Sequence, residues 1–228
     1  MLTIAAVLIG SCGPKGDKKE NDNPQDNNLE MTTEQMKKVE EPEFNIFTTH
    51  GTMRIRLYSK TPKHRDNFAK LVAENFYDSV RFHRVIEGFM IQCGDPFSRD
   101  TALIDKWGTG GPDYTVPAEF VEEYRHKKGA IAAARMGDLA NPSRSSSGSQ
   151  FYIVQDEEGC AHLDGQYTVF GEVVSGLEVI DRIASLRTDR YSRPYEDAII
   201  TAIKPVIQIA EKKETDEQTE KTDSTKAE

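Results

Sequence analysis

Apolar and polar side chains alternate at the start of the central part of the chain. Met53, Ile55 and Leu57 are separated by single polar residues, a period of two that is typical of a strand with one buried face. An apolar segment at residues 44–47 precedes them, and the polar residues 49–52 lie between the two segments. This pattern predicts a β-hairpin.

Two further segments have the spacing of helices. Thr61 and Pro62 place a capping residue before a proline at the first helical position. The apolar residues that follow lie on one helical face, namely Phe68, Leu71 and Val72. This helix should end near Asn75. A second, shorter helix is predicted from Gly176 to Ala184, with three inward residues, Leu177, Ile180 and Ile183.

The remaining apolar runs have the length of strands. Residues 81–95 contain two of them with a tight connection at Glu87-Gly88, and others lie at 130–134, 151–154, 168–174 and 198–209. Residues 96–118 are rich in Gly, Pro and Asp and predict a long loop. Many short strands with two helices predict a mainly β domain, a closed or nearly closed antiparallel barrel with a helix over each end.

Charge divides the chain into a nearly neutral middle and two acidic flanks. Of the formal net charge of −9, residues 13–43 contribute −4 and residues 210–228 contribute −3. Both flanks contain few apolar residues, so burial cannot offset the entropy of ordering them. We expect them to be a disordered tether and a disordered acidic tail. Because the middle carries no basic stripe, nucleic acid is not an expected partner.

The first residues have the features of a targeting signal. Residues 2–9 form an apolar run that is shorter than the roughly 20 residues needed to cross a bilayer and that suits a signal peptide. Ile9-Gly10-Ser11-Cys12 resembles a bacterial lipobox, which implies cleavage before Cys12 and acylation of that cysteine. The expected organisation is a lipoprotein signal peptide at 1–11, the acylated cysteine and tether at 12–43, a folded domain at 44–209 and the tail at 210–228.

This organisation predicts a protein of the cell envelope, lipid-anchored through Cys12 to a bacterial membrane on its periplasmic or outer-membrane side. The positively charged region that normally opens a signal peptide is missing before the apolar run. A plain secretory peptide and a short buried segment are therefore the alternatives for these residues.

The other two cysteines, Cys93 and Cys160, have neither the spacing of a disulfide framework nor that of a metal-ligand set. No metal site is expected. Cys93 lies in an apolar run and is interpreted as a small buried hydrophobe. A Cys93–Cys160 bridge is an open alternative in an oxidising compartment.

Four blocks of the central segment form a recognisable series: Phe82–Asp95, Gly108–Gly111, Gly148–Ile153 and Leu163–Gly171. In this order they resemble the cyclophilins, and the resemblance covers most of residues 44–209. It implies a closed eight-stranded antiparallel β-barrel capped by two α-helices. It also implies a peptidyl-prolyl cis-trans isomerase without a cofactor, expected to be a monomer that binds proline-containing peptides and unfolded, newly exported client proteins.

Rotation about an Xaa–Pro bond breaks no covalent bond, but amide resonance gives it a barrier of about 18–20 kcal/mol. An active site must therefore grip the proline and stabilise a twisted amide whose nitrogen regains its lone pair. By resemblance, Arg84 is the donor that reaches the prolyl nitrogen, and its fork suits that task better than a lysine would. Gln92 should orient Arg84 and hydrogen-bond the substrate.

The resemblance assigns substrate binding to nine further residues. Four should line the proline pocket: Phe89, Met90, Tyr152 and Leu163. Ala134 and Arg135 lie where the family pairs with the peptide backbone. The remaining three are Gln150, His162 and Tyr167.

The chain departs from animal cyclophilins at several of these positions. His162 replaces a tryptophan, Tyr167 a histidine, Tyr152 a phenylalanine and Arg135 an asparagine. Because positions 152 and 167 stay aromatic, proline binding should persist, whereas the loss of the indole donor predicts weaker binding of cyclosporin. The loops at 97–107 and 136–147 are longer than in compact cyclophilins and are candidates for setting client preference.

Two other functions compete with isomerisation. A binding module or chaperone would hold proline segments without catalysis, but the presence of Arg84, Gln92, Phe89 and Met90 argues against a dead site. A hydrolase is disfavoured because the sequence has no evident triad, no Gly-x-Ser-x-Gly elbow around Ser145–Ser147 and no metal spacing. His83 is interpreted as structural, since isomerisation needs no proton transfer.

Overall fold

A computed structural model of the chain describes residues 39–206. The expected signal peptide, the lipidation site at Cys12 and the acidic tail lie outside the described residues. Residues next to the predicted start of the domain at 44 are part of the fold, because Pro42 accepts a hydrogen bond from Leu57 at 3.0 Å and Glu43 begins the first strand. Within the described part, every helix is too short or too polar to cross a membrane.

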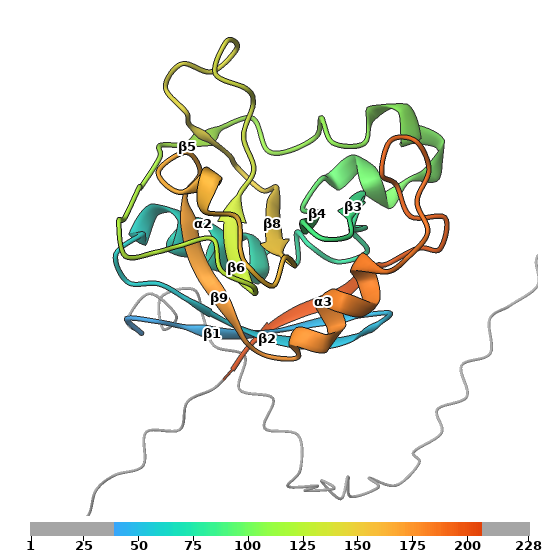
Figure 1. The fold of residues 1–228 in the computed structure, drawn as a ribbon, viewed down its shortest axis with the longest axis horizontal. Coiled ribbons are helices and arrows are strands. Elements are labelled where there is room, and N and C mark those ends of the chain that lie inside the picture. Colours follow the sequence, from blue (N-terminus) through green and yellow to red (C-terminus); the bar gives the residue numbers. More distant parts are fainter. Residues whose placement is uncertain (1–38, 207–228) are drawn as a thin grey trace, which may run out of the picture. The chain divides into compact units, whose positions relative to one another are not determined.

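Over residues 39–206 the fold is an eight-stranded antiparallel sheet with two α-helices (Figure 1). The strands follow the order β10-β1-β2-β9-β6-β8-β4-β3. Their bounds are β1 Glu43–Thr48, β2 Gly51–Leu57, β3 Arg84–Ile86, β4 Met90–Cys93, β6 Ala130–Ala133, β8 Phe151–Val154, β9 Val169–Ser175 and β10 Ile200–Pro205. The helices are α2 Pro62–Ala73 and α3 Leu177–Ala184. The predicted hairpin, both helices and the mainly β class are confirmed.

The predicted closed barrel is only partly closed. The two edge strands, β3 and β10, do not pair along their length. The segment just before β3 joins the sheet instead, since Phe82 N–H donates to Ala198 at 2.9 Å and Ile200 N–H donates to Val80 at 2.8 Å. The strand β3 itself has three residues and pairs with β4. The sheet therefore curls and is closed by a single isolated bridge between Arg81 and Ile199.

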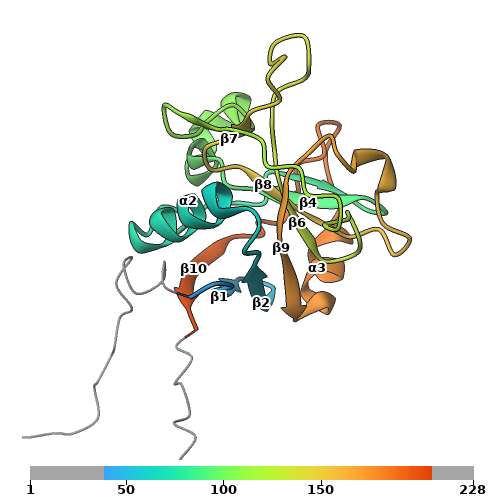
Figure 2. The same ribbon diagram turned by 90° about the vertical axis from the view of Figure 1, so that its left-hand side faces the viewer.

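The helices lie on opposite sides of the curled sheet (Figure 2). Both contribute to one interior cluster, with Phe68 and Leu71 from α2 and Ile180 and Ile183 from α3. Their apolar faces therefore close the interior as the spacing of the sequence predicts. The prediction was wrong for Leu177, which is 39% exposed at the start of α3, while Val179 is buried in its place.

The start of α2 is capped differently from the prediction. Thr61 occupies the cap position, but its side chain makes no capping hydrogen bond. The carboxylate of Glu119 takes this place and accepts the backbone N–H of Lys63 and of His64, each at 3.1 Å. An acidic group favours a helix N-terminus because it accepts otherwise unpaired N–H groups. A single sequence does not show that this group comes from a distant loop.

The two long loops contain more structure than the sequence predicts. Residues 96–118 include two 3₁₀ helices, Pro96–Arg99 and Thr101–Lys106, and the short strand β5, Thr115–Val116. Asp95 and Asp100 accept hydrogen bonds from the first turns of these helices. The strand β5 pairs with β7, Ser146–Ser147, at the end of the loop 136–147.

Candidate active site

The predicted substrate-binding residues gather on the outer face of the sheet. Along β8, Phe151 and Ile153 belong to the main core, while Tyr152 and Val154 belong to a second, smaller apolar cluster. This follows from the period of two along a strand. The second cluster contains all the apolar residues predicted to bind substrate: Phe89, Met90, Ala134, Tyr152, Leu163 and Tyr167.

Arg84 and Gln92 face each other on the neighbouring strands β3 and β4. The Nη1 atom of Arg84 donates to Gln92 Oε1 at 3.3 Å, and the guanidinium carbon lies 6.0 Å from the centre of the Phe89 ring. Burial lowers the pKa of Arg84 from its ordinary value, but an arginine remains protonated in proteins. The structure therefore places a partly desolvated cation beside the apolar cluster.

Gln150 holds Gln92 from the far side. Gln92 Nε2 donates to Gln150 Oε1 at 3.1 Å, and Gln150 Nε2 donates to the carbonyls of Gly108 at 3.1 Å and Gly110 at 2.7 Å. Gln150 is buried. Since these bonds engage both ends of its amide, Gln150 fixes Gln92 rather than presenting an unpaired amide to a ligand.

The glycine block at 108–111 is held by a buried carboxylate. Asp95 is fully buried and accepts N–H bonds from Phe97 at 2.7 Å, from Gly110 at 3.1 Å and from Gly108. A β-carbon at Gly110 would collide with this carboxylate, so a glycine is required there. A series of hydrogen bonds thus runs from Asp95 through the glycine block to Gln150, Gln92 and Arg84.

Aromatic rings form the walls of the outer cluster. The ring of His162 is stacked beside Phe89, with 6.3 Å between centres and 29° between planes. Tyr167 meets Tyr152 edge-on, with 5.9 Å between ring centres. The structure therefore brings together residues from β4, from β8 and from the segment 161–167, as the resemblance implies. Their role in substrate binding stays a prediction.

Arg135 uses its side chain within the protein. Its guanidinium lies 4.5 Å from the centre of the Tyr167 ring, donates to the Gln166 carbonyl at 2.8 Å and pairs with Asp138 at 2.6 Å. The side chain is 5% exposed. The neighbouring Ala134 also has both backbone groups occupied, because its N–H donates to Gln150 and its carbonyl accepts from Ser147. The predicted pairing of Ala134 and Arg135 with a peptide backbone stays a prediction.

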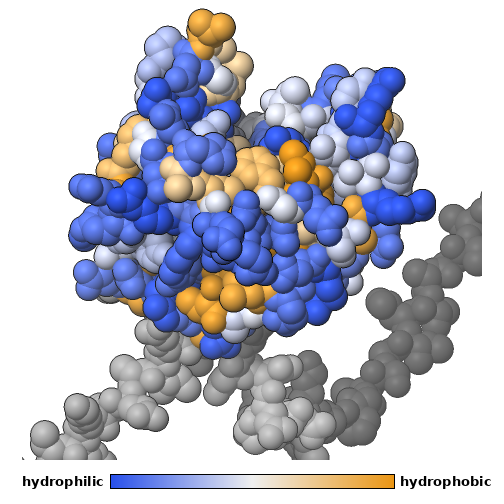
Figure 3. Space-filling view, viewed as in Figure 1, coloured by the Kyte–Doolittle hydropathy of each residue, from blue (hydrophilic) through white to orange (hydrophobic). Residues whose placement is uncertain are grey.

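The loop 136–147 projects from the body of the domain next to this site (Figure 1). Asp138 braces it by pairing with Arg135 at its start and with Arg144 at 2.9 Å. Apolar surface gathers below the projecting loop, on the face that Figure 3 presents. The start of the loop thus lies beside the outer cluster, and its position depends on an arginine that also packs against Tyr167.

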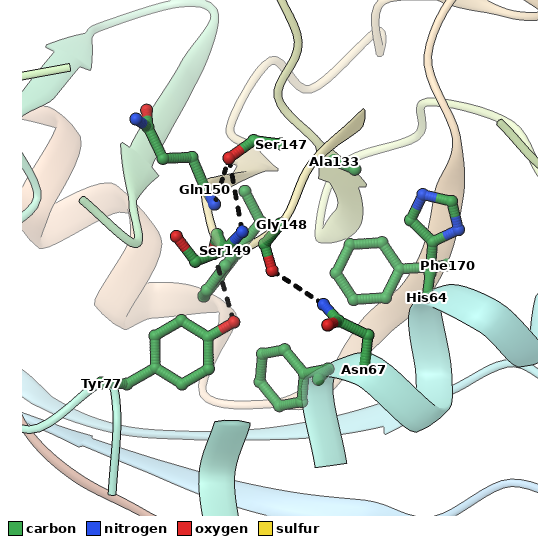
Figure 4. A pocket seen from close by; sticks show the side chains of 11 residues that line it. His64, Asn67, Tyr77, Ala133, Ser147, Gly148, Ser149, Gln150 and Phe170 are labelled. Carbon is green, nitrogen blue, oxygen red and sulfur yellow. Dashed lines mark hydrogen bonds between the residues drawn. The ribbon is translucent and has the colours of Figure 1, made fainter. Parts of the chain in front are cut away.

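A small pocket behind residues 147–150 shows how α2 and the segment that follows it support the site (Figure 4). Asn67 Nδ2 donates to the Gly148 carbonyl at 2.8 Å, and Tyr77 OH donates to the Ser149 carbonyl at 3.3 Å. The amide of Gln150 points away from this pocket (Figure 4). These bonds fix the backbone that carries Gln150 and leads into β8.

The structure does contain a serine, a histidine and a carboxylate in series, which the sequence does not reveal. His64 Nδ1 lies 2.7 Å from Glu119 Oε2, and His64 Nε2 lies 2.9 Å from Ser146 Oγ. His64 and Ser146 are 4% and 2% exposed, so no substrate can reach the hydroxyl. Glu119 also caps α2. The series therefore joins α2 to β7, and hydrolysis remains disfavoured.

His83 is buried directly beside Arg84, and both of its ring nitrogens lack a hydrogen-bond partner among the described residues. Burial lowers the pKa of His83 to about 4. The ring is therefore neutral at neutral pH. It adds no second positive charge beside Arg84, in agreement with a structural role.

This burial predicts that stability depends on pH. Unfolded, His83 takes up a proton near its ordinary pKa of 6.5, whereas the folded protein resists protonation down to about 4. Stability should therefore be fully present above pH 6.5 and fall by about 3 kcal/mol as the pH drops to 4. Urea unfolding of the wild type and of His83→Gln between pH 7.5 and 4 measures this loss of stability. Because all other titratable groups are the same in both proteins, an equal change of the unfolding free energy with pH in the two would contradict the prediction.

The two described cysteines are free. Cys93 is fully buried in the main core, and burial raises the pKa of its thiol, so its interpretation as a small hydrophobe is confirmed. Cys160 belongs to the outer cluster. Since they lie in clusters on opposite faces of the sheet, the alternative of a bridge is not supported.

Sequence reasoning missed several polar residues that hold the site, among them Asp95, His126 and Asp164. Asp95 lies within a recognised block but gives no sign that it binds the glycines. His126 Nε2 lies 3.0 Å from the hydroxyl of Tyr152, and its Nδ1 lies 2.8 Å from Asp164. These partners are 26 and 38 residues away from His126 in sequence, so no local pattern could have found them.

Known proteins resemble this chain in both sequence and structure. The family model described as "Cyclophilin type peptidyl-prolyl cis-trans isomerase/CLD" matches residues 43–205. "Peptidyl-prolyl cis-trans isomerase-like 3" from Gallus gallus is 36% identical over 160 residues, which cover 69% of this chain and 92% of that protein. "Peptidyl-prolyl cis-trans isomerase CYP71" from Arabidopsis thaliana is 37% identical over 156 residues, which cover 68% of this chain but 23% of that longer protein.

A similar solved structure is a cyclophilin type peptidyl-prolyl cis-trans isomerase from Cryptosporidium parvum. It has a TM-score of 0.65 and 27% sequence identity, and the match covers 74% of this chain and 99% of that one. The same protein solved in the presence of the dipeptide Ala-Pro has a TM-score of 0.64, also at 27% identity, with 73% and 99% coverage.

Proposed function

The chain belongs to the cyclophilin-type peptidyl-prolyl cis-trans isomerases, and we propose that Arg84 and Gln92 carry out the isomerisation beside an apolar pocket on the outer face of the sheet. The observation that carries this proposal is the contact between Arg84 and Gln92 at the edge of the outer cluster. In this family's reaction the bond before a proline exchanges between cis and trans. Replacement of Arg84 by alanine, with the rate of prolyl exchange measured by NMR, is the test.

The pocket supplies the grip. Met90 and Tyr152 are buried at 1% and 5% exposure, while Phe89 and Leu163 are partly exposed beside them. A proline ring placed on this surface would bury apolar area, and each Å² of that area would stabilise the complex by about 25 cal/mol. Because the ring is then fixed, only the group on the other side of the amide must rotate.

Arg84 supplies the electrostatic part. As the amide twists, its nitrogen regains a lone pair that can accept a hydrogen bond, whereas the planar amide nitrogen accepts poorly. A guanidinium N–H aimed at that nitrogen therefore binds the transition state more strongly than the ground state. Gln92 occupies one N–H of Arg84, which restricts the arginine side chain before a substrate arrives.

We further propose that the protein is a lipoprotein of a bacterial envelope and assists the folding of exported proteins. The support is the order of the first residues, an apolar run followed by Gly10, Ser11 and Cys12, and the acidic, apolar-poor segment after them. Slow prolyl exchange, over tens to hundreds of seconds, can limit folding. The folding role would be refuted if deletion of the gene left the refolding of exported proline-containing proteins unchanged.

Cys12→Ser should move the full-length protein from the membrane fraction to the soluble fraction. The serine cannot accept the thioether-linked lipid that the lipobox resemblance implies, and a polar chain without acyl groups has little affinity for a bilayer. Fractionation of cells expressing each form, with metabolic labelling by a radioactive fatty acid, measures both effects. Ser11→Ala, which keeps a small residue before the cysteine, is the control and should stay labelled. Labelling of the Cys12→Ser form would contradict the assignment.

A further inference from the structure

The floor of the outer pocket carries a hydroxyl that is held from behind. The hydroxyl of Tyr152 lies 3.0 Å from His126 Nε2, and the other nitrogen of that ring lies 2.8 Å from Asp164 Oδ1. His126 and Tyr152 are 2% and 5% exposed. We propose, on the basis of the function proposed above, that His126 is a positioning residue of the proline pocket, which fixes Tyr152 in the floor and joins the floor to one wall.

The chemistry of the three groups determines where the protons lie. A carboxylate only accepts, so the Nδ1–H of His126 donates to Asp164, and Nε2 is left to accept the O–H of Tyr152. Burial lowers the pKa of His126 more than the hydrogen bond and charge of Asp164 raise it. Burial raises the pKa of Asp164, but hydrogen bonds from His126 and Arg125 outweigh burial, so this pKa lies below its ordinary value. At neutral pH a neutral imidazole therefore lies between a carboxylate and a phenol.

The main chain of His126 holds the same wall. We call residues 159–167 the wall loop, since it carries His162, Leu163 and Tyr167. The N–H of His126 donates to Asp164 Oδ1 at 2.9 Å, and its carbonyl accepts from Cys160 N–H at 2.7 Å. His126 therefore contacts the wall loop at two points and the pocket floor at a third.

The effect of losing this contact follows from burial. In its present position Tyr152 would then bury a hydroxyl without a partner, which costs more than the hydrogen bond itself contributed. The free protein avoids this cost by turning the side chain until its hydroxyl meets water at the pocket, and substrate binding must reverse this movement before proline can pack. The bonds of Arg84 to Gln92 and of Gln92 to Gln150 do not involve His126. The change should therefore affect substrate affinity far more than the rate of the bound substrate.

Two conservative substitutions separate the hydrogen bond of His126 to Asp164 from its hydrogen bond to Tyr152. The amide of asparagine reaches about as far as Nδ1, so His126→Asn keeps a donor for Asp164 and loses the acceptor for Tyr152. The amide of glutamine reaches about as far as Nε2, so His126→Gln keeps the acceptor for Tyr152. Tyr152→Phe removes the hydroxyl in either background and closes a double-mutant cycle.

The measurements use the full chain and a short peptide with one Ala-Pro bond. Exchange NMR gives kcat and KM, and a titration followed by NMR gives Kd. We expect His126→Asn to raise KM and Kd by roughly tenfold, the cost of an unpaired buried hydroxyl, with kcat changed by less than about twofold. His126→Gln should stay within about threefold of the wild type, and the Asn/Phe double variant should return within about threefold of Tyr152→Phe alone.

The proposal is overturned if His126→Asn leaves KM and Kd unchanged, or if Tyr152→Phe does not reverse its effect. Val179→Ala is the control for general destabilisation, because Val179 is buried in the main core on α3. It should lower the melting temperature without changing KM. If the wild type binds the peptide but does not speed its exchange, the proposed reaction fails, while the comparison of Kd values still tests His126.

Discussion

We expect Arg84→Ala to lower kcat/KM for the isomerisation of an Ala-Pro peptide by roughly 10²- to 10³-fold, the usual cost of losing one preorganised donor to a transition state. Arg84 is partly buried and is held by Gln92 at 3.3 Å beside the apolar cluster. Alanine leaves the pocket in place but removes the cation. Most of the loss should therefore appear in kcat, which exchange NMR measures directly.

Two arginine substitutions serve as controls for Arg84→Ala. Arg84→Lys keeps the charge but loses the planar fork, so we expect an intermediate rate. Arg54→Ala removes an exposed arginine on β2 that donates to Asn45, and its rate should equal that of the wild type. Melting curves of all forms show whether they are folded at the assay temperature. A rate for Arg84→Ala within threefold of the wild type would refute the assigned role.

The same experiment separates the enzyme from a binding module. The contact of Arg84 with Gln92, which in turn is held by Gln150, makes sense for a donor that must be in place before the amide twists. A module that only holds proline segments would need the apolar cluster but not this preorganised cation. Peptide binding by the wild type without any acceleration of exchange would favour the module.

The strands of this domain could be predicted because their apolar residues repeat with a simple period. The alternation of Met53, Ile55 and Leu57 places all three in the main core. The run Phe151–Val154 does not alternate in polarity, since both faces of β8 are covered. Its two-sided burial is also why one strand can hold Phe151 in the core and present Tyr152 to the pocket.

The bonds that join distant loops could not be predicted from one sequence. Glu119 caps α2 in place of Thr61, and Gln150 binds the glycine block 40 residues away. Such contacts depend on the final placement of loops, which no local periodicity encodes. The incomplete closure of the barrel was not predicted either, because the sequence does not show that Arg81 and Ile199 form only an isolated bridge between the two edges. Motif blocks identify the candidate residues of the site, whereas the contacts that hold those residues appear only in three dimensions.

Phe68→Ala should lower the free energy of unfolding by about 3–5 kcal/mol, the range for removing a fully packed aromatic ring. Phe68 is 2% exposed on the inner face of α2. Its ring centre lies 5.2 Å from that of Tyr77, 5.6 Å from those of Phe44 and Phe151, and 6.1 Å from that of Phe170. These rings come from several elements, so the vacated volume cannot be filled by the movement of one side chain.

Urea unfolding at neutral pH measures the loss, and Phe120→Ala is the matched control. Phe120 is 43% exposed in a loop, and its replacement should change stability by less than about 1 kcal/mol. Because Phe68 packs behind the sheet and Tyr152 faces the other side, the Phe68→Ala protein that remains folded should retain its kcat/KM. A loss below about 1 kcal/mol for Phe68→Ala would mean that α2 can collapse onto the sheet. The aromatic cluster would then not be what holds this helix against the sheet.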